Sequence, residues 1–173
     1  KPTTIRCCRS RITTEQLKKR LEEEHVLVEN HPYLKDALLI SKYDYLESLE
    51  TFREGLFVVQ DISSMLVGEL AHVQAGAQVI DLCAAPGGKV AERILMEGQA
   101  GCSGHVEARD LTEYKVSLIE ENIERMGLCN VTAVCQDASV YDEKSAGKAD
   151  IVIADLPCSG LGVLGKKTDL KYK

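Results

Sequence analysis

The sequence predicts an α/β fold, in which a parallel sheet carries helices on both faces and follows a small N-terminal α/β unit. From residue 79 onward, short apolar segments alternate with longer segments of helical periodicity, an order typical of parallel sheets with right-handed crossovers. The 45% hydrophobic content of the 173 residues is enough for a core, and the length allows one domain with a small appendage. No apolar run approaches the roughly 20 residues that a membrane span needs.

Residues 1–54 form the expected N-terminal unit. Leu17 and Leu21 lie four positions apart and predict the buried face of a short helix. A threonine ahead of them supplies the side-chain oxygen that caps the first helical turn. Apolar residues predict strands on either side of a turn at 30–32. The expected elements are a helix from Thr13 or Thr14 to about Glu24, a strand at 26–28 and a strand at 37–40.

Residues 55–59 predict a strand that leads into a further helix. Met and Leu residues recur after residue 61 at helical spacing, so we expect them to form a stripe that faces the core. Glycine commonly ends a helix, and Gly76 marks the expected end. The expected cap is Asp61, Ser63 or Ser64, and the expected stripe is Met65, Leu66, Leu70 and Val73.

The segment after residue 79 predicts the parallel sheet itself. We expect strands at 79–83, 104–109, 131–135 and 150–154, with helices at 87–97 and 113–126 between them. The second helix ends at Gly127 and has an apolar side that consists of Val116, Leu118, Ile119, Ile123 and Met126.

The stretch Val79 to Lys89, VIDLCAAPGGK, joins a buried strand to a helix through small residues. Pro86 suits the first helical position, because its missing N–H would have no partner there. Gly87 and Gly88 allow the backbone to come close to a ligand. The start of such a helix exposes free N–H groups at the positive end of the helix dipole, so the stretch predicts an anion site.

Acidic residues follow the other three strands, at Asp110, Asp137 and Asp155. One aspartate at a strand end is commonly a turn residue or a helix cap, but three at equivalent ends favour a ligand, because ligands bind at this rim of parallel sheets. A carboxylate after the second strand suits ribose hydroxyls, and one after the third suits an adenine amino group. The glycines match neither the dinucleotide pattern G-x-G-x-x-G nor the P-loop pattern, so S-adenosylmethionine fits better.

Charge is unevenly distributed along the chain, whose net charge is −6. Residues 1–20 carry seven Lys and Arg against one Glu, and residues 163–173 carry four Lys against one Asp. Two basic ends around an acidic body predict either a local phosphate-binding face or ordinary solvated charge.

The seven cysteines are odd in number and include no C-x-x-C pair, so neither a disulfide framework nor a zinc or other metal site is expected. A reducing, cytoplasmic setting is the simplest account of them.

Two of these segments together resemble the Sun/RsmB-type RNA cytosine-C5 methyltransferases: residues 81–89, DLCAAPGGK, and residues 155–160, DLPCSG. Residues 55–61 and 162–171 extend the resemblance, which is good over 55–173 and loose over 1–54. It implies a class I S-adenosylmethionine-dependent methyltransferase fold, here partial, behind a small N-terminal α/β unit at 1–54 that contacts RNA. It also implies S-adenosyl-L-methionine as methyl donor and RNA as substrate, either ribosomal RNA or tRNA.

The resemblance further implies a role for individual residues. Asp110 would hold the ribose, and Asp137 the adenine. Asp155 would lie near both the donor and the target base, as the acid near cytosine N3. The residues expected around the methionine part are Cys83, Ala84, Ala85, Pro86, Gly87, Gly88 and Lys89.

Cytosine C5 is a poor nucleophile, and a thiolate that adds to C6 makes it reactive toward a sulfonium methyl group. A base then removes the C5 proton, so that the thiol can leave. In the family, the cysteine of the Pro-Cys pair, here Cys158, is linked to this release, and the attacking cysteine lies in a later Thr-Cys motif.

The 173 residues contain no Thr-Cys pair. We therefore expect the chain alone to bind the donor weakly or not at all and to form no 5-methylcytosine. One alternative is a tRNA enzyme in which Cys158 itself attacks. Another is a non-catalytic fragment that binds the donor or RNA, and dimers through the exposed edge of the fourth strand are also expected.

Overall fold

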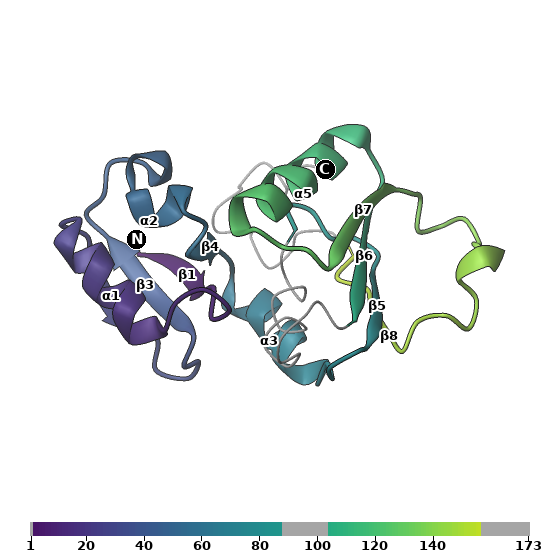
Figure 1. Ribbon diagram of the computed structural model, residues 1–173, viewed down its shortest axis with the longest axis horizontal. Coiled ribbons are helices and arrows are strands. Elements are labelled where there is room, and N and C mark those ends of the chain that lie inside the picture. The colour runs from purple at the N-terminus through teal and green to yellow at the C-terminus, as the bar shows by residue number, and fades with distance from the viewer. Residues whose placement is uncertain (1, 88–103, 157–173) are drawn as a thin grey trace, which may run out of the picture.

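The computed structural model describes residues 2–87 and 104–156, and these form two four-stranded sheets side by side (Figure 1). The first sheet is antiparallel, in the order β2-β3-β1-β4, and the second is parallel, in the order β7-β6-β5-β8. The elements of the first unit are β1 (Thr3–Cys7), α1 (Thr14–Glu23), β2 (Leu27–Asn30), β3 (Ala37–Ser41), η1 (Leu46–Ser48), α2 (Glu50–Arg53) and β4 (Phe57–Val59). Those that follow are α3 (Ile62–Leu70), β5 (Gln78–Asp81), β6 (His105–Asp110), α5 (Glu113–Met126), β7 (Val131–Cys135), η2 (Glu143–Ser145) and β8 (Ile151–Ile153).

Helix α1 begins as its sequence predicts. The Thr13 hydroxyl accepts a hydrogen bond from the backbone N–H of Gln16, and the Gln16 side chain accepts one from the backbone N–H of Thr13. This reciprocal capping box satisfies two N–H groups that the helix leaves without a partner. Leu17 and Leu21 are fully buried against the first sheet, which confirms the predicted face.

Strand β1 was absent from the sequence prediction, because Arg6 and Arg9 made its segment look like solvated charge. Its alternation is nevertheless that of a strand, with Ile5 and Cys7 fully buried on the face that α1 covers. β1 pairs with β4 through Cys7 and Phe57, so β4 belongs to the first sheet, although the sequence grouped residues 55–59 with the following domain.

The side chains that are buried in and just after α3 differ in part from the predicted apolar stripe. Met65 and Val73 are buried, but Leu66 is 42% and Leu70 is 72% exposed. The helix turns Val67 and Ala71 toward the core, and Leu66 and Leu70 lie four residues apart on another side of it. It also ends at Leu70, ahead of the predicted end at Gly76.

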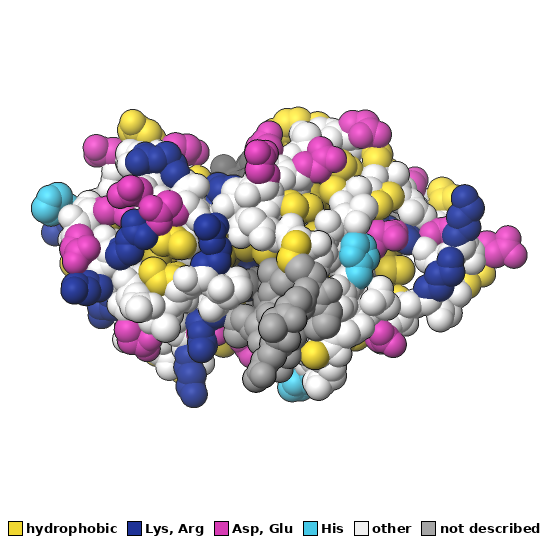
Figure 2. All heavy atoms as spheres, viewed as in Figure 1, with side chains coloured by type: hydrophobic (Ala, Val, Ile, Leu, Met, Phe, Trp, Pro, Cys, Tyr) yellow, Lys and Arg dark blue, Asp and Glu magenta, His cyan; other side chains and the backbone are white. Residues whose placement is uncertain are grey.

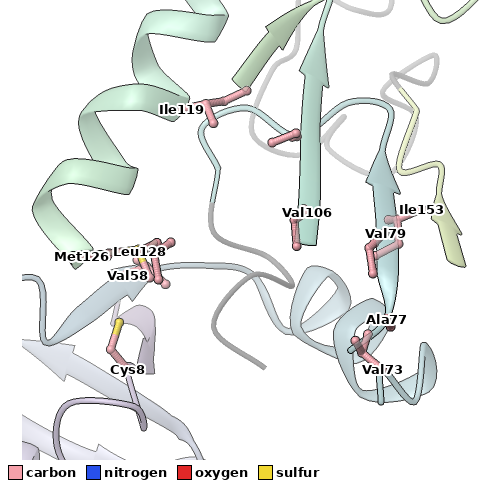
Figure 3. Close-up of a cluster of buried hydrophobic side chains, with 12 residues drawn as sticks. Cys8, Val58, Val73, Ala77, Val79, Val106, Ile119, Met126, Leu128 and Ile153 are labelled. Carbon is pink, nitrogen blue, oxygen red and sulfur yellow. The ribbon is translucent and has the colours of Figure 1, made fainter. Parts of the chain in front are cut away.

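The second sheet has the predicted parallel strands, and α5 packs against it. Thr112 caps α5, and Gly127, at φ +64°, ends it in the left-handed conformation. Val116, Ile119 and Met126 of α5 are buried, as the periodicity predicts. Ile119 and Met126 join side chains of β5, β6 and the α3 region in one apolar cluster (Figure 3).

The same cluster continues into the first sheet. Cys8 and Val58 from the N-terminal unit lie beside Met126 and Leu128, which are at and just beyond the end of α5 (Figure 3). The two sheets therefore share one apolar core at this junction.

The opposite face of the second sheet is covered in part by a connecting segment. Among the described residues it carries the long β7–β8 connection with η2. Arg109 is buried there and donates to Glu107, Asp142 and Ser145. Val152 of β8 is 58% exposed, so part of this face is open in the described structure. None of the helices described in the structure is long and apolar enough to cross a membrane.

Candidate functional site

A cavity of about 380 Å³ lies at the carboxyl ends of β5, β6 and β7. It brings together Cys83, Asp110 and Asp137, which the sequence placed at successive strand ends. Asp155, which follows β8, is exposed and does not line this cavity, although its neighbour Leu156 does. The lining residues are Leu82, Cys83, Asp110, Leu111, Lys115, Gln136, Asp137, Ala138, Ser139 and Leu156.

The loop 82–87 is tied to the strands beside it by backbone hydrogen bonds. The N–H of Leu82 donates to the carbonyl of Ile153, at 2.9 Å, and the N–H of Ala84 donates to the carbonyl of Arg109, also at 2.9 Å. Ala84 is buried in the apolar cluster. The loop is thus anchored to β8 on one side and to β6 on the other.

Pro86 and Gly87 differ from the predicted start of a helix. The Ala85–Pro86 peptide bond is cis, Pro86 lies in a turn, and Gly87 has φ +97°, so the helix does not begin at either residue. A Cβ at Gly87 would lie 3.3 Å from the Cα of Ile119, so this glycine permits a close approach of the loop to α5. Gly88, Lys89 and the rest of the helix expected at 87–97 lie outside the described residues.

Asp110 is the best-connected residue of the site, and its side chain is 3% exposed. It accepts hydrogen bonds from the N–H of Leu111 at 2.8 Å, from Lys115 Nζ at 2.9 Å and from the N–H of Ala85 at 3.1 Å. Burial raises the pKa of Asp110, but these three donors outweigh it and lower the pKa below its usual value. The carboxylate is therefore ionised and holds the loop to the end of β6.

Asp137 is exposed and is fixed by Ser139. Its Oδ1 atom accepts both the backbone N–H of Ser139, at 2.8 Å, and the hydroxyl of Ser139, at 2.7 Å. These hydrogen bonds lower the pKa of Asp137, which keeps the carboxylate ionised at the edge of the cavity.

The cysteines partly depart from the sequence expectation. Cys129 is disulfide-bonded, whereas Cys7, Cys8, Cys83 and Cys135 are not. No pairing of Cys129 was predicted, because cysteine spacing alone cannot reveal which residues the fold brings together. Cys158 lies outside the described residues.

Several basic side chains of the N-terminal segment pair with acidic side chains. Arg9 contacts Asp36 at 2.8 Å and Arg20 contacts Glu54 at 2.6 Å, and each pair raises the pKa of its arginine. Figure 2 shows Lys and Arg side chains interspersed with Asp and Glu side chains over this unit. On the described surface, the mixed charge favours the solvated-charge interpretation over a uniform phosphate-binding face. The basic stretch 163–173 lies outside the described residues.

Three residues of α5 near the site were missed by the sequence reasoning: Lys115, Asn122 and Arg125. Lys115 pairs with Asp110, and Asn122 donates from Nδ2 to the carbonyl oxygen of Pro86, at 2.9 Å. Arg125 in turn donates to Asn122 Oδ1, at 2.7 Å. All three lie on the polar side of an amphipathic helix, where a sequence pattern predicts only contact with solvent.

Comparison with known proteins gives a consistent result. The model of the 16S rRNA methyltransferase RsmB/F family matches residues 69–173. The Bacillus subtilis protein named "Probable ribosomal RNA small subunit methyltransferase B" is 34% identical over 171 residues, which are 98% of this chain and 37% of that protein. The chain thus spans little more than a third of the length of this curated relative.

Two solved structures from Pyrococcus horikoshii are also similar. A methyltransferase homolog has a TM-score of 0.80 at 26% identity, over 99% of this chain and 55% of that one. NSun6 with SFG has a TM-score of 0.78 at 20% identity, over 92% of this chain and 64% of that one, and at this identity it shows the fold alone. Together with the parallel order of the second sheet, these likenesses confirm the predicted class I methyltransferase fold.

Proposed function

Because the chain belongs to the RsmB/F family of 16S rRNA methyltransferases, we propose that its protein transfers a methyl group from S-adenosyl-L-methionine to C5 of a cytosine in ribosomal RNA. The relatives named rRNA small subunit methyltransferase B support the choice of RNA. We place the protein in the cytoplasm, because a ribosomal RNA enzyme must meet its substrate there.

The cavity at the strand ends carries this proposal. Two ionised carboxylates, Asp110 and Asp137, are acceptors for ribose hydroxyls and for an adenine amino group, and both line the same 380 Å³ space. Leu82, Leu111 and Leu156 add apolar surface for a flat base. The available donors, acceptors and space fit an adenosine ligand.

In this proposal, the loop that begins at Cys83 surrounds the methionine part of the donor, and its sequence continues through Gly88 and Lys89. Asp110 holds the ribose and Asp137 the adenine. The bound donor supplies an electrophilic methyl group. Asp155 holds a proton at cytosine N3, which draws electrons from the ring when a thiolate adds to C6. Cys158 assists the release of the methylated base, and the attacking cysteine belongs to a Thr-Cys motif that these 173 residues do not contain.

The test is made in the organism that carries the gene. It compares strains with the Asp155→Asn substitution, with the Cys158→Ala substitution and with the gene deleted. Bisulfite sequencing maps 5-methylcytosine in ribosomal RNA and in tRNA. We expect the deletion and Asp155→Asn to remove 5-methylcytosine from small-subunit ribosomal RNA. A loss in tRNA instead would favour the tRNA alternative, and unchanged methylation in both RNAs would refute the proposal.

The role of Cys158 has its own test. An RNA that contains 5-fluorocytosine traps the covalent adduct between the attacking cysteine and the base. We expect the Cys158→Ala protein still to form this adduct, which gel electrophoresis detects. Loss of the adduct in that variant would make Cys158 the nucleophile.

The 173-residue chain is expected to bind S-adenosylmethionine weakly or not at all and to form no 5-methylcytosine. Robust transfer of labelled methyl to RNA by this chain would overturn that expectation. We also propose that the chain dimerises through the edge of the second sheet at β8, which among the described strands pairs with β5 alone. Size-exclusion chromatography tests this, and a monomer at all concentrations would count against it.

A further inference from the structure

Two side chains of α5 connect the loop 82–87, called the donor loop below, to the N-terminal unit. Asn122 donates from Nδ2 to the carbonyl oxygen of Pro86, at 2.9 Å, and Arg125 donates from Nη2 to Asn122 Oδ1, at 2.7 Å. Pro86 belongs to the loop 82–87 beside the cavity. The two bonds in series form a short relay that leads from this loop across the surface of α5.

The orientation of the Asn122 amide follows from its partners. Arg125 offers only donors, so it must meet the amide oxygen. The amide nitrogen then faces two carbonyl groups, those of Pro86 and of Leu118, the latter at 3.1 Å. Each polar atom of Asn122 therefore has a partner of the correct kind, and the side chain has one favoured orientation.

The far end of the relay lies in the N-terminal unit. Arg125 donates from Nη1 to the carbonyl of Phe52 at 2.9 Å and to the carbonyl of Phe57 at 3.1 Å. Its guanidinium also lies 4.2 Å from the centre of the Phe52 ring, within the range of a cation–π contact. Phe52 is in α2 and Phe57 is in β4, so one guanidinium fork holds two elements of the first unit.

Backbone contacts reinforce this end of the relay. Arg11, which follows β1, donates to the carbonyl of Glu54 at 2.5 Å and to the carbonyl of Arg125 at 3.3 Å. The latter carbonyl is near the C-terminal end of α5, where a cation is favourable. Gly55 packs so closely on Arg125 that a Cβ would lie 2.1 Å from its carbonyl oxygen. The N-terminal unit and the end of α5 are thus in direct backbone contact.

We propose that Asn122 and Arg125 are positioning residues, which hold the donor loop 82–87 in its place relative to the N-terminal unit. The small N-terminal unit then supports the methyl-donor site as well as any contact with RNA. This inference rests on the proposed function for the identity of the ligand, S-adenosylmethionine. The hydrogen bonds of the relay are present in the ligand-free protein, so they do not depend on the identity of the ligand.

The first test measures amide hydrogen exchange in the 173-residue chain without ligand. The probes are the N–H of Ala85, which donates to Asp110, and the N–H of Gly87, which donates to the carbonyl of Ala84. Asn122→Asp keeps an acceptor for Arg125 but loses the donor to Pro86. The substitution removes the one hydrogen bond of the relay that reaches the loop, so we expect both probes to exchange about fivefold faster, while amides of α2 and β4 are unchanged.

Two further variants separate the relay from general destabilisation. Arg125→Ala removes the hydrogen bond to Asn122 and both hydrogen bonds to the N-terminal unit, so we expect faster exchange at the loop probes and also in α2 and β4. Glu121→Ala, at an exposed neighbouring position of α5, is the matched control and should change neither. Loop exchange in Asn122→Asp and Arg125→Ala that equals that of Glu121→Ala would overturn the proposal.

The second test measures S-adenosylhomocysteine affinity of the intact protein by calorimetry. We expect about tenfold weaker binding in Asn122→Asp and unchanged binding in Glu121→Ala. Faster loop exchange with unchanged affinity would overturn the link between the relay and the donor site. No binding by the unsubstituted protein would count against the proposed function. The exchange experiment would still show whether Asn122 and Arg125 position the loop.

Discussion

Substitution of Gly55 by alanine should break the junction between the two sheets. A Cβ at Gly55 would lie 2.1 Å from the carbonyl oxygen of Arg125, whereas ordinary contact begins at 3.4 Å, so the two backbones must separate by about 1.3 Å. That movement disrupts the nearby hydrogen bonds from Arg11 to the Arg125 carbonyl and from Arg125 to Phe57. Each is worth about 1 kcal/mol of net stability.

Gly55 also has φ +67°, a conformation that costs alanine roughly 1–2 kcal/mol. Added to the two hydrogen bonds, this predicts a loss of about 3–4 kcal/mol in the free energy of unfolding. Gly127 is a matched control, because its φ is +64° and, in the described structure, a Cβ there meets nothing within 4 Å. Gly127→Ala should lose only the conformational part.

The assay is urea denaturation of both variants, followed by circular dichroism, with the slope m checked for constancy. The unfolded chain loses similar entropy in the two Gly→Ala changes, so this contribution cancels in the comparison. We expect Gly55→Ala to be less stable than Gly127→Ala by about 2 kcal/mol. Equal stability of the two variants would refute the contact argument.

Four further substitutions test other parts of the structure. Ile119→Ala should lose about 2–4 kcal/mol because Ile119 is fully buried, whereas Leu70→Ala should stay within about 0.5 kcal/mol; similar urea midpoints for the two would contradict the assignment of the α3 face. Thr13→Ala should cost about 1 kcal/mol through loss of the cap, and an unchanged thermal midpoint would argue against that cap. Asp110 has a lowered pKa, so its stabilisation is present above its unfolded pKa of about 3.9 and is lost as pH falls through the folded pKa. Asp110→Asn should therefore lose less stability than the unsubstituted chain between about pH 5 and pH 2, and parallel pH curves would disprove this.

The parallel sheet was predictable because its strands are short apolar runs separated by helical periods. β5, β6, β7 and β8 all lie within or close to the predicted ranges, and α5 begins and ends where Thr112 and Gly127 indicate. These signals are local, so the sequence carries them without knowledge of the fold.

Elements that depend on their neighbours were harder to predict. β1 is a strand because β3 and β4 pair with it on both sides, and Arg6 between Ile5 and Cys7 concealed their alternation. The stripe predicted for the α3 region was half correct, because Met65 and Val73 are buried but Leu66 and Leu70 are exposed. Val67 and Ala71 pack against the core in their place. Tertiary packing decided which of two adjacent apolar faces became buried.

The residues of the candidate site also fall into those that the sequence predicts and those that depend on distant neighbours. Cys83, Asp110 and Asp137 were found because the ends of parallel strands meet at one rim. Asn122 and Arg125 were missed because their partners are mainly backbone carbonyls of distant segments, which leave no mark in the sequence. The turn at Pro86 was missed because a proline in this position is equally compatible with the first turn of a helix.

Because Cys8, Val58, Met126 and Leu128 share one core, the N-terminal unit cannot be removed or exchanged without disturbing the second sheet. A protein shortened to begin at residue 55 would keep β4 but lose β1, the strand with which β4 pairs. Phe57 would be stripped of the side chains that bury it. Any replacement of the N-terminal unit, by evolution or by design, must therefore replace β4 together with it, because β4 pairs with β1 and its Val58 packs in the core shared with α5.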